Sequence, residues 1–190
     1  ATARKDNIFS KIGGFVSFGG NIMQQKRSKS TATAGTLLVP NLFDVNNGVD
    51  KPDVTASLTQ RKMNSLYGSL QLNWDGWLFL DVTARNDWSS TMAKENRSYF
   101  YPSVSLSAVI SDMVQKNGGS MPDWFSFAKV RASFAEVGND LDPYQLYNVY
   151  TISKDGWSNS MASAGNTLFD ASVKSELIKS WEVGADLRFF

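Results

Sequence analysis

The sequence predicts an all-β, antiparallel protein of about six long strands. Apolar and polar side chains alternate with a period of two in six stretches, which is the pattern of a strand with one apolar face. These stretches are about twice as long as the roughly 5–6 residues usual in soluble proteins. Aromatic residues gather where the stretches end, as they do at the two interfaces of a membrane barrel.

The six strands follow one another along the whole chain. They are expected at 12–24, 61–74, 77–88, 98–111, 126–137 and 177–190. The clearest is 98–111, where Phe100, Val104 and Leu106 share one parity and serines dominate the other. Glycines in 12–24 weaken a strand but allow bends or close packing.

The connections between the strands differ in length. Asp75-Gly76 is a two-residue link of the kind that type I′ hairpins favour, so the strands on either side are antiparallel. We expect a medium loop at 91–97, a linker with a short helical turn at 112–124, and long loops at 25–59 and 138–176. The long loops therefore lie on one side, and the tight turn and the linker lie on the other.

Two architectures fit this pattern. A transmembrane β-barrel needs strands of about 9–11 residues, alternating apolar and polar faces, and short turns on one side with long loops on the other. A soluble β-sandwich also alternates, because its apolar faces meet in a core. The strand length and the loop asymmetry favour the barrel, while periodicity alone leaves the sandwich open.

Composition excludes several classes of function. The 19 basic and 18 acidic side chains give a net charge of +1, which offers no electrostatic footprint for nucleic acid. The chain has no cysteine and no histidine, so it lacks a thiolate nucleophile, the commonest metal ligand and the usual general base. We therefore expect no enzyme, no catalytic or metal site, no cofactor and no nucleic-acid partner.

Several segments resemble one known family. WLFLDVTARNDWSST followed by SYFYPSVSLSAVISD closely resembles a signature stretch of the SusC/RagA family of TonB-linked outer-membrane transporters of Bacteroidetes. Further segments look like that family in the same order: GGNIMQ, LVPNLFDV, RKMNSLYGSLQLNW, FAKVRASFAEVGND, PYQLYNVYT and SWEVGADLRFF. The resemblance covers most of residues 12–190.

The resemblance implies a fold and a function. Family members form a barrel of about 22 strands in the outer membrane, with a plug and a TonB-contacting segment. They import large nutrients, either oligosaccharides or peptides, with a SusD-like surface lipoprotein. Six strands cannot close a barrel, because the smallest have about eight. Residues 1–190 are therefore expected to be a partial barrel domain that lacks the plug and the TonB-contacting segment. The alternative is a soluble β-sandwich module that binds glycans.

Eight charged residues share the parity of the expected lumen face. They are Asp81, Arg85, Asp87, Lys129, Arg131, Glu182, Asp186 and Arg188. Charges on lumen faces commonly pair with one another, so we interpret them as a structural network, in which Arg85 pairs with Asp81 or Asp87, in preference to a substrate passage. The same charges could contact a plug.

Exposed aromatic residues are expected in the last long loop. Tyr144, Tyr147, Tyr150 and Trp157 lie there, and such rings stack on sugars or pack against a partner. The stretch 43–53 has acidic and amide side chains at alternating positions. It fails the EF-hand pattern, which needs a glycine and a glutamate at fixed positions, so we predict a solvated turn and no calcium site.

Overall fold

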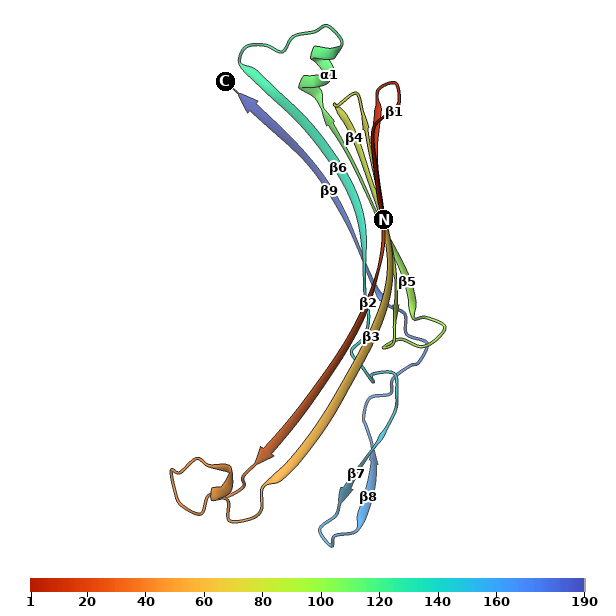
Figure 1. The fold of residues 1–190 in the computed structure, drawn as a ribbon. Coiled ribbons are helices and arrows are strands. Elements are labelled where there is room, and N and C mark those ends of the chain that lie inside the picture. The colour runs from red at the N-terminus through yellow and green to blue at the C-terminus, as the bar shows by residue number, and fades with distance from the viewer. Residues whose placement is uncertain (190) are drawn as a thin grey trace.

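The computed structural model describes residues 1–189, except the side chain of Asn7, and Phe190, the end of the last predicted strand, lies outside the described residues. Figure 1 shows a narrow, curved sheet with the helix and short turns at one end and long loops at the other. Its elements are β1 (Thr2–Phe9), β2 (Ile12–Thr33), η1 (Val45–Asn47), β3 (Asp53–Trp74), β4 (Leu78–Ser89), β5 (Ser98–Val109), α1 (Ile110–Lys116), β6 (Phe125–Asn139), β7 (Tyr150–Lys154), β8 (Ser160–Ala164) and β9 (Glu176–Phe189).

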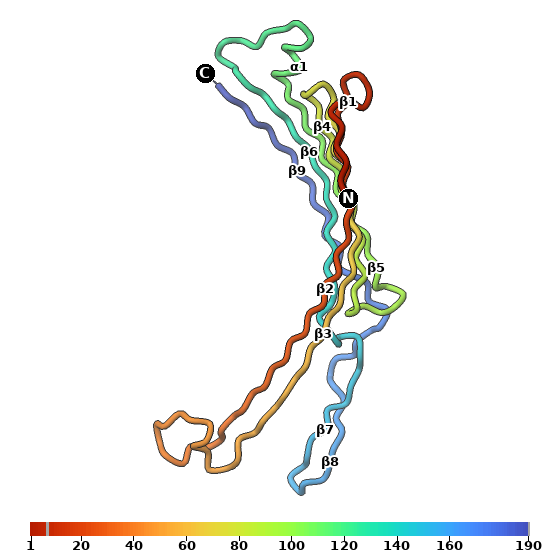
Figure 2. The backbone as a smooth tube through the Cα atoms, viewed as in Figure 1, coloured from red at the N-terminus to blue at the C-terminus, as the bar shows by residue number. Residues whose placement is uncertain are grey.

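Seven strands form one sheet in the order β1-β2-β3-β4-β5-β6-β9, and β7 and β8 form a separate hairpin. Every pair of neighbouring strands is antiparallel. The backbone trace in Figure 2 shows the sheet strands lying side by side along the curved strip. The predicted all-β antiparallel fold is confirmed.

The strand registers bring the apolar positions into rows across the sheet. One row runs over six strands: Val16, Leu70, Val82, Val104, Phe134 and Trp181 are successive partners. Because side chains alternate between the two faces, a shared row means a shared face. The alternation read in each strand is therefore in phase with that of its neighbours, and the sheet has one continuous apolar face.

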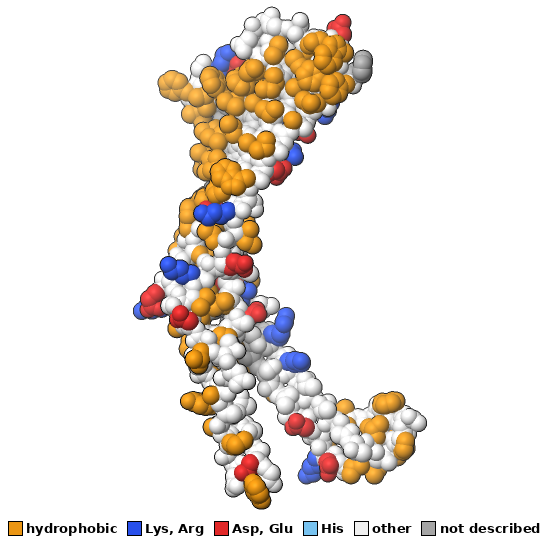
Figure 3. Space-filling model, turned by 180° about the vertical axis from the view of Figure 1, so that it is seen from behind, with side chains coloured by type: hydrophobic (Ala, Val, Ile, Leu, Met, Phe, Trp, Pro, Cys, Tyr) orange, Lys and Arg blue, Asp and Glu red, His pale blue; other side chains and the backbone are white. Residues whose placement is uncertain are grey.

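No second layer covers this face. Trp181 and Val183 are 79% and 85% exposed, and within the described residues only Met92, Tyr99 and Ala128 are buried hydrophobic residues. In the space-filling view the hydrophobic side chains gather over the end of the sheet that carries the short turns (Figure 3). A β-sandwich needs two sheets packed face to face, so the alternative prediction of a sandwich is wrong.

The height of the apolar face matches a bilayer. Five successive rows, from the pair Ile12–Trp74 to the pair Asn86–Phe100, carry mainly apolar side chains. Four steps of two residues span about 27 Å along the strands, at about 3.4 Å per residue. A tilt of about 40° reduces that to about 20 Å, close to the apolar band of outer-membrane barrels, which is about 25 Å tall.

Aromatic rings mark the turn end of the band. Trp74 and Trp77 have ring centroids 5.9 Å apart, and Trp124 stacks on Phe189 at 6.2 Å. Such rings occupy the interface between hydrocarbon and water. The ring of aromatics predicted at the opposite end is only partly present, because Tyr99 is buried instead of facing lipid.

Several predicted boundaries are wrong. The loop expected at 25–59 spans only 34–52, because β2 and β3 both continue far beyond the apolar band. Residues 26–33 are almost all polar and carry no period-two signal, whereas the alternation of Val54, Ala56 and Leu58 with polar residues in 53–60 was missed. Strand β1 and the β7–β8 hairpin were also missed, since neither has a long apolar face.

The turn between β3 and β4 has the predicted backbone but a different length. Asp75 and Gly76 have φ values of 51° and 72°, as a type I′ turn requires. The register pairs Trp74 with Leu78, so three residues connect the strands where we predicted two. The predicted helical turn is present as α1, which begins at Ile110, inside the predicted strand 98–111.

A single charge on either face should separate lipid from lumen. Val104 lies in the middle row of the apolar face, and Ser105 lies on the opposite face. In the membrane-inserted protein, Val104→Lys should lower the free energy of unfolding by about 2–4 kcal/mol, the cost of a lysine near the bilayer midplane. Ser105→Lys should cost less than about 1 kcal/mol. Urea unfolding in lipid vesicles measures both, and equal losses would contradict the assignment of faces.

Candidate functional site

The polar face of the sheet carries the candidate site. Its rows are also in register, as in the row Asp81, Ser105, Ser133 and Glu182. These side chains alternate with those of the apolar face, so they point to the opposite side of the same sheet. In a membrane barrel this side is the lumen.

Arg85 lies at the centre of a buried network on this face. Its Nε donates to Asp87 Oδ1 at 2.8 Å, and its second guanidinium nitrogen donates to Ser65 Oγ at 3.0 Å. The Tyr101 hydroxyl donates to the other oxygen of Asp87, which is 3% exposed. Of the two partners we proposed for Arg85, the structure brings Asp87 to it and places Asp81 elsewhere. Both oxygens of the buried carboxylate are bonded, as a buried charge requires.

Arg131 lies between two carboxylates of β9. Its guanidinium is 3.3 Å from Glu182 and 3.8 Å from Asp186. All three side chains are at least half exposed, so each ion pair contributes about 0–1 kcal/mol. Arg188 lies 5.0 Å from the ring centroid of Phe127, a cation–π contact.

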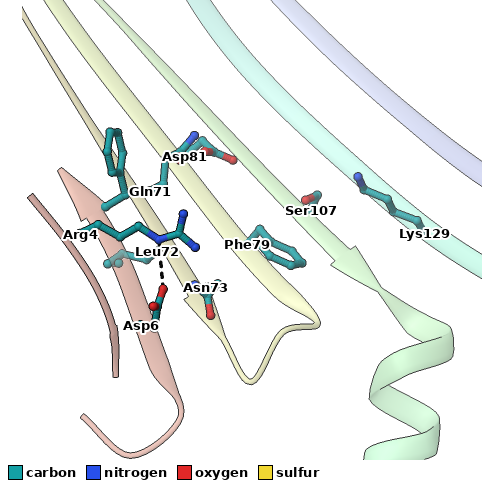
Figure 4. Close-up of a pocket in the computed structure, with 11 residues that line it drawn as sticks. Arg4, Asp6, Gln71, Leu72, Asn73, Phe79, Asp81, Ser107 and Lys129 are labelled. Carbon is teal, nitrogen blue, oxygen red and sulfur yellow. Dashed lines mark hydrogen bonds and ion pairs between the residues drawn. The ribbon is translucent and has the colours of Figure 1, made fainter. Parts of the chain in front are cut away.

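The remaining two predicted lumen charges line a cavity of about 550 Å³ near the turn end. Asp81 projects into it from β4 near Arg4 of β1, and Lys129 lines it from β6, on the side away from Arg4 and Asp6 (Figure 4). Arg4 and Asp6 pair at 3.0 Å, whereas neither Asp81 nor Lys129 forms an ion pair with another described residue. The eight predicted charges thus fall into four separate sets and do not form one network: Arg85 with Asp87, Arg131 with Glu182 and Asp186, Arg188 on Phe127, and Asp81 with Lys129.

A second buried network was missed by the sequence analysis. Asp140, whose side chain is 2% exposed, lies 2.5 Å from a guanidinium nitrogen of Arg61. Its other oxygen accepts hydrogen bonds from the hydroxyls of Ser89 and of Thr91, the latter at 2.9 Å. Strand β3, the end of β4 and the end of β6 are therefore tied together where the outer loops begin. Both signature stretches, RNDWSST and FAEVGND, contribute to this contact.

Tyr99 lies near both networks. It stacks on Tyr101 with centroids 5.9 Å apart, and a Cβ at Gly138 would come within 2.7 Å of its ring. Only glycine at 138 leaves room for the ring, because real Cβ atoms do not approach other atoms so closely. This packing explains why Tyr99 is buried and absent from the aromatic band at the membrane interface.

The four loop aromatics divide into two pairs. Tyr144 and Tyr147 line a cavity of about 400 Å³ together with Met92 and Lys94, and the Tyr144 hydroxyl accepts a hydrogen bond from the Gln60 N–H at 3.1 Å. Two others, Tyr150 and Trp157, belong to the β7–β8 hairpin, and Trp157 is 87% exposed.

Asp75 holds the opposite end of the sheet. Lys11 donates to one carboxylate oxygen at 3.0 Å and Lys116 of α1 to the other at 3.1 Å. These hydrogen bonds, first from Lys11 and then from Lys116, lower the pKa of Asp75 below its ordinary value. The contact fastens α1 and the β1–β2 turn to the β3–β4 turn.

The described part of the chain contains neither a metal site nor a helix that could cross a membrane. Within residues 1–189, no group of three or more acidic side chains could hold a metal ion. The residues 43–53 form a structured turn in which Asp44 accepts from the Asn46 N–H at 2.7 Å. Among the described helices none is long and apolar enough to cross a membrane.

Comparison with known proteins identifies the family. The model of TonB-dependent receptor-like β-barrels matches residues 7–190. The chain belongs to this family. Its members are receptors and transporters, not enzymes, and lie in the bacterial outer membrane, so the predicted family and location are confirmed.

Individual relatives are much longer than this chain. TonB-dependent receptor P3 of Formosa agariphila is 23% identical over 181 residues, which are 90% of this chain and 18% of that protein. The structure of the RagAB peptide transporter matches with a TM-score of 0.82 and 18% identity, over 100% of this chain and 21% of that chain. The RagAB peptide importer in its closed-closed state matches with a TM-score of 0.81 and 17% identity, over 100% of this chain and 21% of that one. The chain spans about a fifth of the length of these relatives, and the structural likeness shows the fold.

Breaking the network around Asp140 should loosen the outer loops. Asp140→Asn leaves the partly buried Arg61 without its counter-charge, and we expect the free energy of unfolding to fall by about 2 kcal/mol. Asp142→Asn is the matched control, because Asp142 is exposed and surface changes usually cost under about 0.5 kcal/mol. Urea unfolding in detergent measures both variants. Losses of the same size would show that the Asp140 contact adds nothing to stability.

The Asp75 contact should depend on pH. A carboxylate whose pKa is lowered by folding contributes stability above its ordinary pKa of 3.8, and the contribution disappears as the pH falls through the lowered pKa. Hydrogen exchange at the amides of α1 should therefore be slower in the wild type than in Asp75→Asn at pH 6. The difference should shrink below pH 3.8. A difference that stays constant with pH would rule out the Asp75 charge as the cause.

Proposed function

We propose that residues 1–190 form part of the wall of an outer-membrane transporter that imports large nutrients, either oligosaccharides or peptides. The observation that supports this most directly is the single-layer sheet, with an exposed apolar face about as tall as a bilayer and a polar, ion-paired opposite face. Only lipid can cover the first face, and only a water-filled or plugged lumen suits the second.

We further propose that other strands of a longer protein complete the barrel. The outer edges of β1 and β9 have no neighbour among the described strands, and open strand edges are a liability that closed barrels remove. The solved relatives are described as a peptide transporter and a peptide importer, and the chain spans about a fifth of them. A plug would meet the polar face, where Asp81 and Lys129 line the large cavity.

The proposed partners follow from the family. A SusD-like surface lipoprotein would meet the loops at the outer end, where Trp157 and Tyr150 are exposed. The TonB complex would act through parts of the protein other than the barrel wall. The segments 26–33 and 53–60 extend beyond the apolar band, so they would carry the outer loops well clear of the membrane.

Uptake by cells tests the proposed function. Deletion of the gene should abolish uptake of a fluorescent nutrient, either heptapeptides or maltoheptaose, and restoring the full-length protein should restore it. Loss of TonB should have the same effect as deletion. Uptake of both nutrients that is unchanged by deletion, or that is insensitive to TonB, would contradict the proposal.

A further inference from the structure

One edge of β3 has no partner in its outer part. β3 begins at Asp53, but its pairing with β4 begins only at Met63, opposite Ser89. There β4 turns into the loop that leads to β5. The edge is therefore open because the neighbouring strand ends, and both strands lie within the described residues.

The backbone groups that face this edge can be assigned by alternation. In an antiparallel strand, successive residues direct their N–H and C=O groups to opposite sides. The Ser90 N–H donates to Lys62 O, and the Lys62 N–H donates to Ser90 Oγ, both at 2.9 Å. The Gln60 N–H donates to the Tyr144 hydroxyl on the same side. The N–H and C=O groups of even-numbered residues therefore point to the open edge. Val54, Ala56 and Leu58 present three backbone donors and three backbone acceptors there, which have no partner among the described residues.

The edge also lacks the usual protection. Natural edge strands carry lysine, proline or a bulge that discourages pairing with another chain. Residues 53–59 read DVTASLT and contain neither lysine nor proline, and their pairing with β2 runs without a register shift. Val54 and Leu58 are 63% and 50% exposed. In Figure 3 the arm formed by β2 and β3 stands apart from the second arm, which carries the β7–β8 hairpin.

Two cavities flank the inner end of this edge. One of about 360 Å³ is lined by polar and charged side chains, among them Arg27, Thr59 and Asp142. The other is the cavity of about 400 Å³ with Tyr144 and Tyr147, which Gln60 also lines. Pro143 lines both cavities, so they adjoin each other at the inner end of the edge. An added strand along this edge would end beside both cavities.

We propose that the open edge of β3 at Val54, Ala56 and Leu58 binds a short, extended peptide of the cargo, which joins the sheet as an additional strand. The edge repeats its donors and acceptors every two residues, about 6.8 Å, which matches a peptide backbone and no glycan. Ser90 and Tyr144 close the edge at its inner end, so it accommodates about five to seven residues. This proposal rests on the proposed function, of which it specifies the cargo class.

One substitution removes a donor from the edge. Ala56→Pro deletes the N–H that points to the open side, and the ladder with β2 keeps its hydrogen bonds, because these come from odd-numbered residues. Ala56→Thr is the matched control, since it keeps the N–H and suits a strand. The probe is a tryptic digest of casein applied to the full-length protein, with maltoheptaose as the comparison. Retained peptides are identified by mass spectrometry.

We expect peptides to bind to the wild type and Ala56→Thr with equal affinity, and Ala56→Pro to bind at least about tenfold more weakly, as loss of a backbone hydrogen bond predicts. Bound peptide should slow hydrogen exchange at Val54, Ala56 and Leu58 and leave Thr55 and Ser57 unchanged. N-methylation of the retained peptides at alternate amides gives a second test that does not depend on the folding of Ala56→Pro. Methylation of one alternating set of amides should abolish binding, and methylation of the other set should leave it unchanged.

Three results would overturn the proposal. They are the absence of peptide binding, equal binding to Ala56→Pro, and binding that leaves exchange at the edge unchanged. Protection of the edge only by an intact protein partner would also overturn it, because the occupant would then be a partner loop. TonB-dependent uptake of maltoheptaose without any peptide binding would refute the edge site and leave the proposed transporter intact.

Discussion

The whole structure depends on one constraint, which is that a single sheet exposes a continuous apolar face with no protein layer against it. The row from Val16 to Trp181 crosses six strands without a break, and none of its side chains is buried by another element. In water such a face would drive aggregation. A bilayer accommodates such a face, because neighbouring strands of the sheet bond one another's backbone groups.

The polar face follows from the same constraint. Charges removed from bulk water by neighbouring strands must be paired, and Asp87 and Asp140 each bond through both carboxylate oxygens. Both networks lie toward the outer end of the sheet, where β4 and β6 end. The outer loops therefore start from a rigid base, and the exposed aromatics and the open edge of β3 are presented beyond it.

The sequence predicted the parts that alternate. Val104 and its neighbours were assigned to one apolar face, which the strand registers confirm, and Asp75-Gly76 marked the turn because few residues adopt positive φ. The outer half of β2 was missed because residues 26–33 are almost all polar, whereas the outer half of β3 carries an alternation at Val54, Ala56 and Leu58 that was overlooked. The contacts of Asp140 could not be predicted, since Arg61, Ser89 and Thr91 are brought to it only by the pairing of strands distant in sequence.

Spin labels along β4 give the most direct test that one face of the sheet meets lipid and the other meets an aqueous lumen. Residues 1–190 contain no cysteine, so once any cysteine elsewhere in the full-length protein is replaced, single cysteines can be introduced one at a time from Leu78 to Ala84 and spin-labelled in lipid vesicles. Labels at even positions should collide with oxygen dissolved in the bilayer, and labels at odd positions should collide with a water-soluble nickel complex. Uniform contact with the nickel complex at both parities would contradict this assignment of the two faces.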